Sequence, residues 1–399
     1  MAEWIECKIA DIGTVVGGAT PSTKQTENYD NGTISWITPK DLSSFNERYI
    51  DRGERNITEI GLNSCSTQLL PKNSILFSSR APIGYIAIAA NELCTNQGFK
   101  SIIPSECIEP LFLYYLLKYN KDKIESMGSG TTFKEVSGTT MKNIVVSVPN
   151  DKIIQKKISL LLGSIDDKIE NNNRINNNLE QQAQVIFKSW FVDFEPYDGV
   201  MPSNWHISQL GSIARISTEV FSPSKSPNVE VEHYSIPAYD EKHYPVFENS
   251  DGIKSNKYRL TSNSVMISKL NPDTKRIWRP YCVSNRPICS TEFIVYEPIN
   301  PLNRDFVYSI VDSVGFSAYL CSHTTGSTNS RQRATPSITL NYNIVLPDDK
   351  TLRSFCSIVT PMYDAIENNI KENQKLAITR DILLPKLMSG ELDVSDIDL

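Results

Sequence analysis

The sequence predicts an α+β protein in which two mixed, β-rich globular domains are separated by two long helices packed as an antiparallel coiled coil. Two observations lead to this prediction. Segments that begin near residues 151 and 351 repeat apolar side chains at helical spacing, and features of residues 1–150 return in the same order after residue 203. Such repetition indicates two copies of one unit. We therefore expect an internal pseudo-two-fold repeat, with each globular domain followed by a long helix.

The first long segment runs from Asp151 to Trp190 and contains no proline. Its predicted seam follows alternating spacings of four and three: Ile154, Ile158, Leu161, Ile165, Lys168, Asn172, Ile175, Leu179, Gln182 and Ile186. This is the period of a helix that packs along a partner helix. A helix of this length, about 60 Å, needs a second long helix beside it.

The second segment, Thr351 to Leu384, supplies that partner. Both segments contain the string Ile-Glu-Asn-Asn, which ends at Asn172 in the first and at Asn369 in the second. A buried asparagine in the seam would fix the register at a cost in stability, whereas a solvated asparagine would carry no such role, and both alternatives stay open. Pro361 is expected to kink the second helix or to start it.

The repeated unit is read from features that differ in kind but keep their order. Matched pairs are Trp4 with Trp205, Ser74–Ser79 with Ser264–Lys269, Phe112–Tyr119 with Phe306–Ser313, Gly128-Ser129 with Gly326-Ser327, and Val146–Pro149 with Ile344–Pro347. In the first copy we expect strands at Glu3–Thr14, Ile34–Thr38, Ser74–Ser78, Ile83–Ala90 and Ile144–Val148, and a helix at Pro110–Tyr119. The predicted boundaries are 1–150 and 203–350 for the globular domains, 151–192 for the central helix, 193–202 for a connector, and 351–399 for the C-terminal helix and tail.

Composition limits the class of protein. With 399 residues, 40% of them hydrophobic, the chain is long enough for two or three domains. A net charge of −6 argues against a surface that binds nucleic acid throughout, but allows a local basic groove. Eight cysteines and four histidines show no zinc-ligand spacing, so we expect buried thiols in a reducing compartment. No signal peptide and no membrane-spanning stretch are recognised, which favours the cytoplasm.

The sequence contains no motif typical of a phosphate-binding loop, a dinucleotide-binding fold, a nucleophile elbow or a zinc protease. We therefore expect a binding protein without catalytic residues, metal or cofactor.

A basic stretch at residues 254–286 is the strongest binding feature. Its basic residues are Lys254, Lys257, Arg259, Lys269, Lys275, Arg276, Arg279 and Arg286, against the single acid Asp273. Basic residues interleaved with aromatic ones suit contact with phosphates and base edges. A solvated basic face is the alternative, but the otherwise acidic chain favours binding. The candidate contacts are Lys269, Lys275, Arg276 and Arg279, extended by Arg331 and Arg333.

The first copy has fewer candidates, all in expected loops and turns. They are Thr38 and Lys40 after a strand, Ser78, Ser79 and Arg80 in a turn, Asn96 and Gln97, and Thr131 and Thr132 in a glycine-containing loop. Each residue alone is more often a turn former than a contact. Together, on the loops of one β-rich domain, they form a plausible nucleic-acid surface.

Six sets of strings carry a resemblance to a known family: Gly18–Ser22 with Ile34–Leu42, Phe77–Gly84, Thr95–Phe99, Gly128–Thr131, Phe187–Phe194 and Leu384–Leu392. Through them the chain resembles the specificity subunit of type I restriction-modification systems, over essentially its whole length. The second globular domain departs from the first-copy pattern, since it lacks the Trp-Ile-Thr-Pro-Lys and Ser-Ser-Arg-Ala-Pro strings.

The resemblance implies two target recognition domains, each reading one half of a bipartite site in double-stranded DNA. It also implies that the helices set the gap between the halves and bind two methyltransferase subunits, which recruit restriction subunits. The alternative is a noncatalytic coiled-coil scaffold that binds other proteins, and an enzyme is a more distant third. Retention on DNA that falls steeply with salt would separate the first two.

Overall fold

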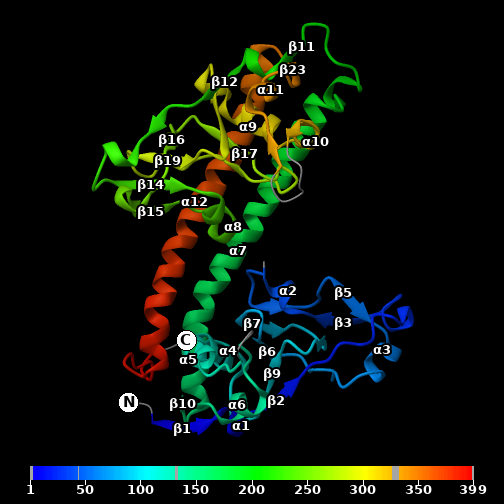
Figure 1. The fold of residues 1–399 in the computed structure, drawn as a ribbon, viewed down its shortest axis with the longest axis vertical. Helices are drawn as coiled ribbons and strands as arrows, with labels where there is room; N and C mark the ends of the chain where they lie inside the picture. Colours follow the sequence, from blue (N-terminus) through cyan, green and yellow to red (C-terminus); the bar gives the residue numbers. More distant parts are fainter. Residues whose placement is uncertain (1–2, 44, 131–133, 326–331, 398–399) are drawn as a thin grey trace. The chain divides into compact units, whose positions relative to one another are not determined.

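The computed structural model describes residues 3–43, 45–130, 134–325 and 332–397. The chain forms two compact units: unit 1 comprises Met1–Asn171 and Asn373–Leu399, and unit 2 comprises Asn172–Glu372 (Figure 1). Two helices of 40 residues, α7 (Lys152–Phe191) and α12 (Asp349–Met388), each contribute one part to each unit. The prediction of mixed α and β structure with two long helices is therefore confirmed.

Unit 1 is built on a five-stranded sheet with the order β2-β9-β6-β7-β4, in which only β4 and β7 run parallel. The strands are β2 (Gly13–Gly17), β9 (Lys100–Pro104), β6 (Ile75–Ser79), β7 (Ile83–Ala89) and β4 (Tyr49–Ile50). Smaller sheets join β5 (Arg55–Ile57), β3 (Ile34–Ile37) and β8 (Cys94–Thr95), and pair β1 (Trp4–Lys8) with β10 (Val145–Pro149). The helices are α1 (Ile9–Ile12), α2 (Pro39–Leu42), α3 (Glu59–Asn63), α4 (Pro110–Tyr119), α5 (Lys121–Ser126) and α6 (Gly138–Asn143).

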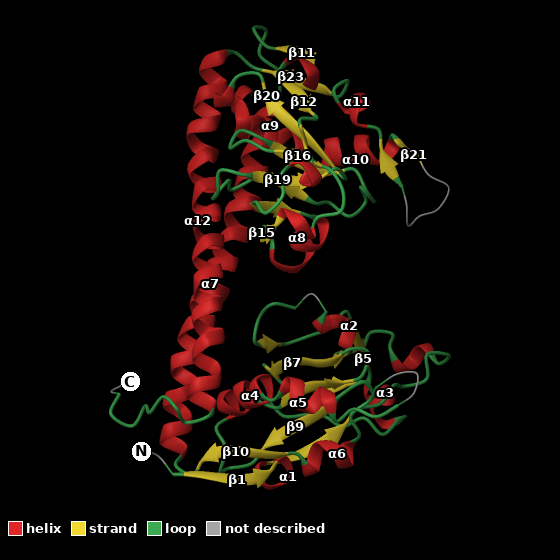
Figure 2. Ribbon diagram, turned by 60° about the vertical axis from the view of Figure 1, so that its left-hand side comes forward, coloured by secondary structure: helices red, strands yellow, loops and turns green. Residues whose placement is uncertain are grey.

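Helix α4 joins this sheet to the long helices in one core (Figure 2). It starts at Pro110, which suits the first helical position, and the Glu109 carboxylate accepts a hydrogen bond from the Phe112 amide at 2.5 Å. All residues from Phe112 to Leu117 are buried. A single apolar cluster contains these side chains, Phe77 of the sheet, Ile158 of α7 and Leu387 of α12. Burial of this shared surface is what holds the sheet to the helices.

Unit 2 contains a four-stranded antiparallel sheet, β12-β20-β17-β18, and a five-stranded sheet, β13-β16-β19-β14-β15. The strands are β12 (Ala214–Ser217), β20 (Phe293–Pro298), β17 (Val265–Ser268), β18 (Ile277–Trp278), β13 (Val220–Phe221), β16 (Lys257–Arg259), β19 (Pro287–Ser290), β14 (Glu230–Tyr234) and β15 (Val246–Asn249). Pairs are formed by β11 (His206–Gln209) with β23 (Asn343–Leu346), and by β21 (Thr324–Thr325) with β22 (Arg333–Ala334). The helices are α8 (Ile236–Lys242), α9 (Arg304–Asp312), α10 (Val314–Ser322) and α11 (Pro336–Thr339).

Aromatic side chains fill the core of unit 2. Phe191 of α7 lies 5.0 Å from Phe355 of α12 and 5.1 Å from Phe306 of α9, measured between ring centroids. Edge-on ring contacts of this kind add to the hydrophobic effect of burial. They fix the ends of both helices against the globular part of the unit.

Most expected elements of the first copy are confirmed within one residue at each end, and Pro110–Tyr119 is helical as predicted. The single strand expected at Glu3–Thr14 is wrong, because β1 and β2 are separated by the helical turn α1. The Asp11 carboxylate accepts a hydrogen bond from the Lys8 amide at 2.7 Å and so caps this turn. Among the cysteines, which are all free, Cys107 and Cys321 are exposed and contradict the expected burial. No helix within the described residues has the length and apolarity to cross a bilayer.

The predicted seam of α7 is only partly correct. Ile154, Ile158 and Asn172 are buried, but Lys168 and Gln182 are exposed. Beyond Asn172 the buried positions move by one residue along the sequence, to Asn176, Ala183 and Phe187. The reason is that α7 buries one face against α12 and another against its own globular part, while a straight helix drifts from a seven-residue repeat.

The central asparagines of unit 2 are hydrogen bonded between the helices. Asn172 is fully buried and its amide donates to Glu372 at 2.8 Å, while the Asn369 amide donates to the Asn176 side-chain oxygen at 2.8 Å. Asn176 lies closer to the end of α7 than Asn172, and its partner Asn369 lies closer to the start of α12 than Glu372. The two helices therefore run antiparallel in this unit. The solvated alternative is thus excluded for Asn172.

Helix α12 begins earlier than expected and continues past Pro361. The Asp348 carboxylate caps its start, accepting hydrogen bonds from the Lys350 amide at 3.0 Å and from the Trp205 indole at 3.1 Å. These bonds, with those from Thr351, lower the pKa of Asp348 to about 2. Pro361 therefore does not start this helix.

A buried arginine joins the globular part of each unit to a long helix. In unit 1, Arg48 donates to the Glu170 carboxylate through its backbone amide, Nε and a terminal nitrogen at 2.8 to 3.0 Å, and also contacts Asp167. In unit 2, Arg279 donates to Glu367 at 2.9 Å and to Asp364 at 2.6 Å. Glu170 and Glu367 are the glutamates of the two Ile-Glu-Asn-Asn strings. We call these contacts the Arg48 anchor and the Arg279 anchor.

Replacing Arg48 by methionine should lower the free energy of unfolding by about 3–5 kcal/mol, because it leaves the buried Glu170 carboxylate without its partner. Urea unfolding of the full chain, followed by circular dichroism, measures this change. Arg80→Met is the matched control: Arg80 is half-exposed and 3.6 Å from Glu135, so its loss should cost less than about 1 kcal/mol. Equal effects of the two substitutions would show that the Arg48 anchor does not stabilise the fold.

Candidate nucleic-acid interface

Backbone hydrogen bonds bring the predicted loops of unit 1 to one edge of its sheets. The Asn96 amide donates to the Ile37 carbonyl at 3.0 Å, and the Ser79 amide donates to the Gly98 carbonyl at 2.7 Å. The Val136 amide donates to the Ser79 carbonyl at 3.0 Å. The loops that follow β3, β6 and β8 therefore meet the end of the glycine-containing loop. Candidates as far apart in the sequence as Thr38 and Gln97 therefore lie in neighbouring loops.

Thr38 and Lys40 are held by a short capped helix. Thr38 caps α2, and its amide and hydroxyl both donate to the Asp41 carboxylate at 2.7 Å. Lys40 lies on the exposed side and pairs with Glu54 at 2.7 Å, which raises the pKa of Lys40. An ion pair this exposed is weak. Lys40 can therefore exchange Glu54 for a phosphate at little cost.

Ser78 and Ser79 are not available at the surface, which corrects their assignment as contacts. Both are fully buried. The Ser78 hydroxyl donates to the Pro82 carbonyl at 2.8 Å, and the Ser79 hydroxyl donates to the Gly98 carbonyl at 3.1 Å. The two serines shape the turn instead. Arg80, the next residue, is half-exposed and reaches Glu135 at 3.6 Å.

Asn96 and Gln97 occupy the neighbouring turn. The Asn96 side-chain oxygen accepts a hydrogen bond from the Gly98 amide at 2.8 Å, while Gln97 is exposed and accepts one from the Thr20 hydroxyl. The chain at Gly18 passes so close to the Thr95 and Asn96 carbonyls that a Cβ atom would overlap them. Thr20 therefore joins this edge, although it was not among the predicted contacts. Thr131 and Thr132 lie outside the described residues.

Unit 2 builds an equivalent edge around Lys269. The Ala334 amide donates to the Lys269 carbonyl at 2.9 Å, the same backbone bond that joins Val136 to Ser79 in unit 1. Arg333 lies beside it, bridged to Leu270 and ion-paired with Glu292 at 3.0 Å, which raises the pKa of Arg333. Lys269 and Arg333 thus lie together, as predicted. Arg331 is outside the described residues.

Asn271 is a further polar residue at this edge that sequence reasoning did not select. Its amide donates to the Gln332 carbonyl at 2.9 Å, and its φ of 47° is left-handed. The Asn271 side-chain oxygen is buried and accepts no hydrogen bond within the part of the chain that the structure describes. Unsatisfied buried acceptors are uncommon and costly. The turn formed by Asn271-Pro272-Asp273 was the available sequence signal.

The other basic candidates are bound by carboxylates distant in sequence. Lys275 pairs with Asp312, and Arg276 makes two bonds to Asp240 at 2.6 and 2.9 Å. Arg279, 6% exposed, forms the Arg279 anchor and also binds Asp305 at 2.9 Å. Its assignment as a DNA contact is corrected, because moving the Arg279 side chain would break its hydrogen bonds to Asp305, Asp364 and Glu367.

Within the described ranges, no group of histidine, cysteine, aspartate and glutamate side chains could hold a metal ion. The two edges instead combine amides, hydroxyls and exposed basic groups. Amides and guanidinium groups can read base edges, and basic groups can neutralise phosphates.

The chain is similar to known proteins of one family. Residues 1–181 match the family described as the type I restriction modification DNA specificity domain. The type I restriction enzyme MjaIX specificity subunit of Methanocaldococcus jannaschii is 35% identical, over 99% of this chain and 95% of its own length. The type I restriction enzyme HindI specificity subunit of Haemophilus influenzae is 23% identical, over 98% of this chain and all of its own.

A solved structure supports the same fold. The crystal structure of the type I restriction-modification system S subunit from M. genitalium superposes with a TM-score of 0.61, covering 97% of this chain and 96% of that chain at 16% identity. Similarity at this level shows the fold, while the relative from Methanocaldococcus jannaschii extends the relationship in sequence to almost the whole chain. The chain therefore belongs to the family of type I restriction enzyme specificity subunits.

Proposed function

We propose that this chain is the noncatalytic DNA sequence-recognition subunit of a type I restriction-modification complex, and that each globular part reads one half of a bipartite site in double-stranded DNA. The observation that carries the proposal is the edge common to both units. Val136 bonds to Ser79 in one unit as Ala334 bonds to Lys269 in the other, and polar loops surround both bonds. The family membership favours this role over a coiled-coil scaffold.

The DNA contacts follow from these two edges. In unit 1 they are Thr38, Lys40, Arg80, Asn96, Gln97, Thr131 and Thr132, joined by Thr20. In unit 2 they are Lys269, Arg331 and Arg333, joined by Asn271. Lysine and arginine neutralise phosphates, and asparagine, glutamine and arginine can each form paired hydrogen bonds with a base. Because the two edges carry different side chains, the two half-sites differ in sequence.

The two units are copies related by a pseudo-two-fold repeat. Both place the first and last strands of the globular part together, β1 with β10 and β11 with β23. Both anchors use an aspartate and a glutamate three residues apart, at matched positions of the long helices. Residues 1–150 and 203–350 are the target recognition domains, 151–192 and 351–399 carry the helices, and 193–202 is the connector.

The long helices form an antiparallel coiled coil that sets the gap between the half-sites. Each helix is about 60 Å long. Two polar pairs support one fixed register: Asn172 with Glu372, and Asn369 with Asn176. Each pair would lose its hydrogen bond if one helix slid along the other. A spacer with a fixed register holds DNA-reading domains at a fixed distance.

Two methyltransferase subunits bind at two equivalent grooves, and restriction subunits join through them. The groove in unit 2, about 600 Å³, lies beside Phe191, Val314 and Ile344. The groove in unit 1, about 520 Å³, lies beside Met388 and Val146. Phe191 and Met388 are the last residues of the two long helices. Val314 is 88% exposed, and apolar side chains open to solvent are typical of surfaces that a partner covers. The complex works in the cytoplasm and needs no membrane.

Replacing residues 203–350 with the matching part of a relative should change one half of the recognised sequence and leave the other half unchanged. The reason is that each edge is built within its own unit. Methylome sequencing of cells that carry the hybrid with its methyltransferase reads both halves at once. A change in both halves would refute independent reading by the two domains.

Lys269→Ala should weaken DNA binding and lower the salt dependence of the binding constant by about one charge, because one phosphate contact is lost. Fluorescence anisotropy of a labelled cognate duplex at several salt concentrations measures both effects. Arg276→Ala is the matched control, since two hydrogen bonds to Asp240 already engage the Arg276 guanidinium. An unchanged salt slope for Lys269→Ala, or an equal change in the control, would remove Lys269 from the interface.

Deleting Asn172–Asn178 together with Asn369–Lys375 should shorten the unspecified gap by about three base pairs, because seven helical residues span ~10 Å. The deletion removes both members of each central polar pair and leaves both anchors intact, so the seam stays in phase. Methylome sequencing gives the gap, and circular dichroism checks folding. An unchanged gap in a folded, DNA-binding deletion variant would show that the helices do not set it.

A further inference from the structure

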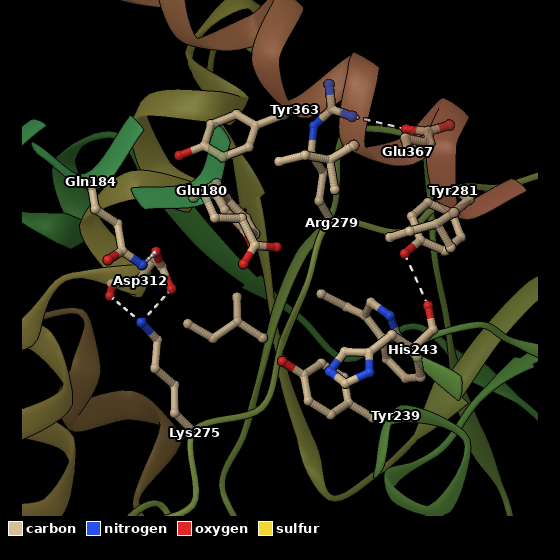
Figure 3. A pocket seen from close by; sticks show the side chains of 15 residues that line it. Glu180, Gln184, Tyr239, His243, Lys275, Arg279, Tyr281, Asp312, Tyr363 and Glu367 are labelled. Atoms are coloured by element: carbon tan, nitrogen blue, oxygen red, sulfur yellow. Dashed lines mark hydrogen bonds and ion pairs between the residues drawn. The ribbon is translucent and has the colours of Figure 1, made fainter. Parts of the chain in front are cut away.

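A cavity of about 240 Å³ in unit 2 is not used by the proposed DNA contacts. Aromatic side chains from four parts of the unit line it (Figure 3). They are Tyr239 of α8, Trp278 and Tyr281 at and after β18, Tyr308 of α9, and Tyr363 of α12. Tyr239 lies 5.2 Å from Trp278, and Tyr308 lies 4.8 Å from Tyr363, between ring centroids. The negative faces of aromatic rings attract cations.

Most of the charged groups around this cavity already neutralise one another. Asp312 pairs with Lys275 and accepts a hydrogen bond from the Gln184 amide at 2.6 Å. Glu367 binds Arg279 at 2.9 Å and Lys371 at 2.6 Å. Each of these two carboxylates therefore has a cation beside it.

Glu180 is different. Its carboxylate projects from α7 toward the middle of the cavity (Figure 3), and neither an ion pair nor a hydrogen bond joins it to any residue that the structure describes. Glu180 reaches solvent through the cavity mouth, yet the surrounding protein and the nearby Asp312 raise its pKa. The charge of Lys275 lowers the same pKa, but Lys275 is paired with Asp312, so the Glu180 carboxylate has no ion-pair partner of its own among the described residues.

We propose that this cavity binds one guanidinium or ammonium group, carried by an arginine or lysine side chain of the methyltransferase subunit. The inference rests on the proposed function. Glu180 would supply the counter-charge and the aromatic rings would supply cation–π contacts. The carboxylates exclude a phosphate. The volume, equal to about eight waters at ~30 Å³ each, suits the end of a side chain better than a drug-sized ligand.

The position of the cavity identifies the source of the cation. Gln184, Lys275, Asp312 and Tyr363 line both this cavity and the apolar groove proposed for the methyltransferase subunit. A partner segment lying in the groove would therefore reach the cavity with a neighbouring side chain. An apolar contact with one buried charge at its border is the usual arrangement of an energetically important interface.

The test measures association of the full chain with its methyltransferase subunit by isothermal titration calorimetry. Glu180→Gln removes the charge and keeps the shape, and should weaken association by about tenfold. Glu241→Gln, on the exposed side of α8, is the matched control and should change nothing. Val314→Asp tests the groove itself. Equal thermal unfolding of the Glu180→Gln variant and the unaltered chain will show that the substitution preserves the fold.

The outcomes separate the two proposals. Weakening by both Glu180→Gln and Val314→Asp supports the inference. Weakening by Val314→Asp alone overturns it and leaves the proposed docking groove in place, and weakening by neither overturns both. Agmatine, a small guanidinium compound, is titrated into the isolated chain as a second probe. Agmatine binding that Glu180→Gln abolishes, with association to the methyltransferase subunit unchanged, would assign the cavity to a free cation and overturn the partner side chain.

Discussion

The buried arginine anchors are the interactions on which the rest of the structure depends. Each long helix is too polar along much of its length to be held by apolar burial alone, since asparagine and glutamate fill its middle. Arg48 and Arg279 bind the aspartate and glutamate that flank this polar middle, Asp167 with Glu170 and Asp364 with Glu367. Removing one partner of a buried ion pair is strongly destabilising. The two anchors therefore hold each globular part at one position along its long helix.

This arrangement explains how an acidic chain can present basic binding surfaces. Four of the eight basic residues of the 254–286 stretch are paired with carboxylates from other elements, as Arg276 is with Asp240 and Lys275 with Asp312. The charges that remain usable are exposed ones, such as those of Lys40 and Arg333, whose ion pairs are weak in water. Binding capacity therefore depends on the exposure of an ion pair rather than on the local count of basic residues.

In unit 2, the final turns of α7 face three different surroundings. The final turns of α7 carry Phe187 and Phe191 into the aromatic core, expose Val185 in the apolar groove, and direct Glu180 into the neighbouring cavity. One helix can contact all three because its side chains point in all directions around the axis. The groove and the cavity proposed for a partner are thereby joined to the core of unit 2 through a single helix.

The sequence by itself determined the mixed α and β structure, the two long helices and the family resemblance, because these rest on local periodicity and on strings of neighbouring residues. Only the tertiary structure decided which seam positions are buried, and which polar residues are free to bind. Ser78, Ser79 and Arg279 looked like contacts because serine and arginine commonly are. Pro82 is only four residues from Ser78 in the sequence. Gly98 and the carboxylates of α9 and α12 reach Ser79 and Arg279 only through packing between segments distant in sequence, which one-dimensional spacing does not encode.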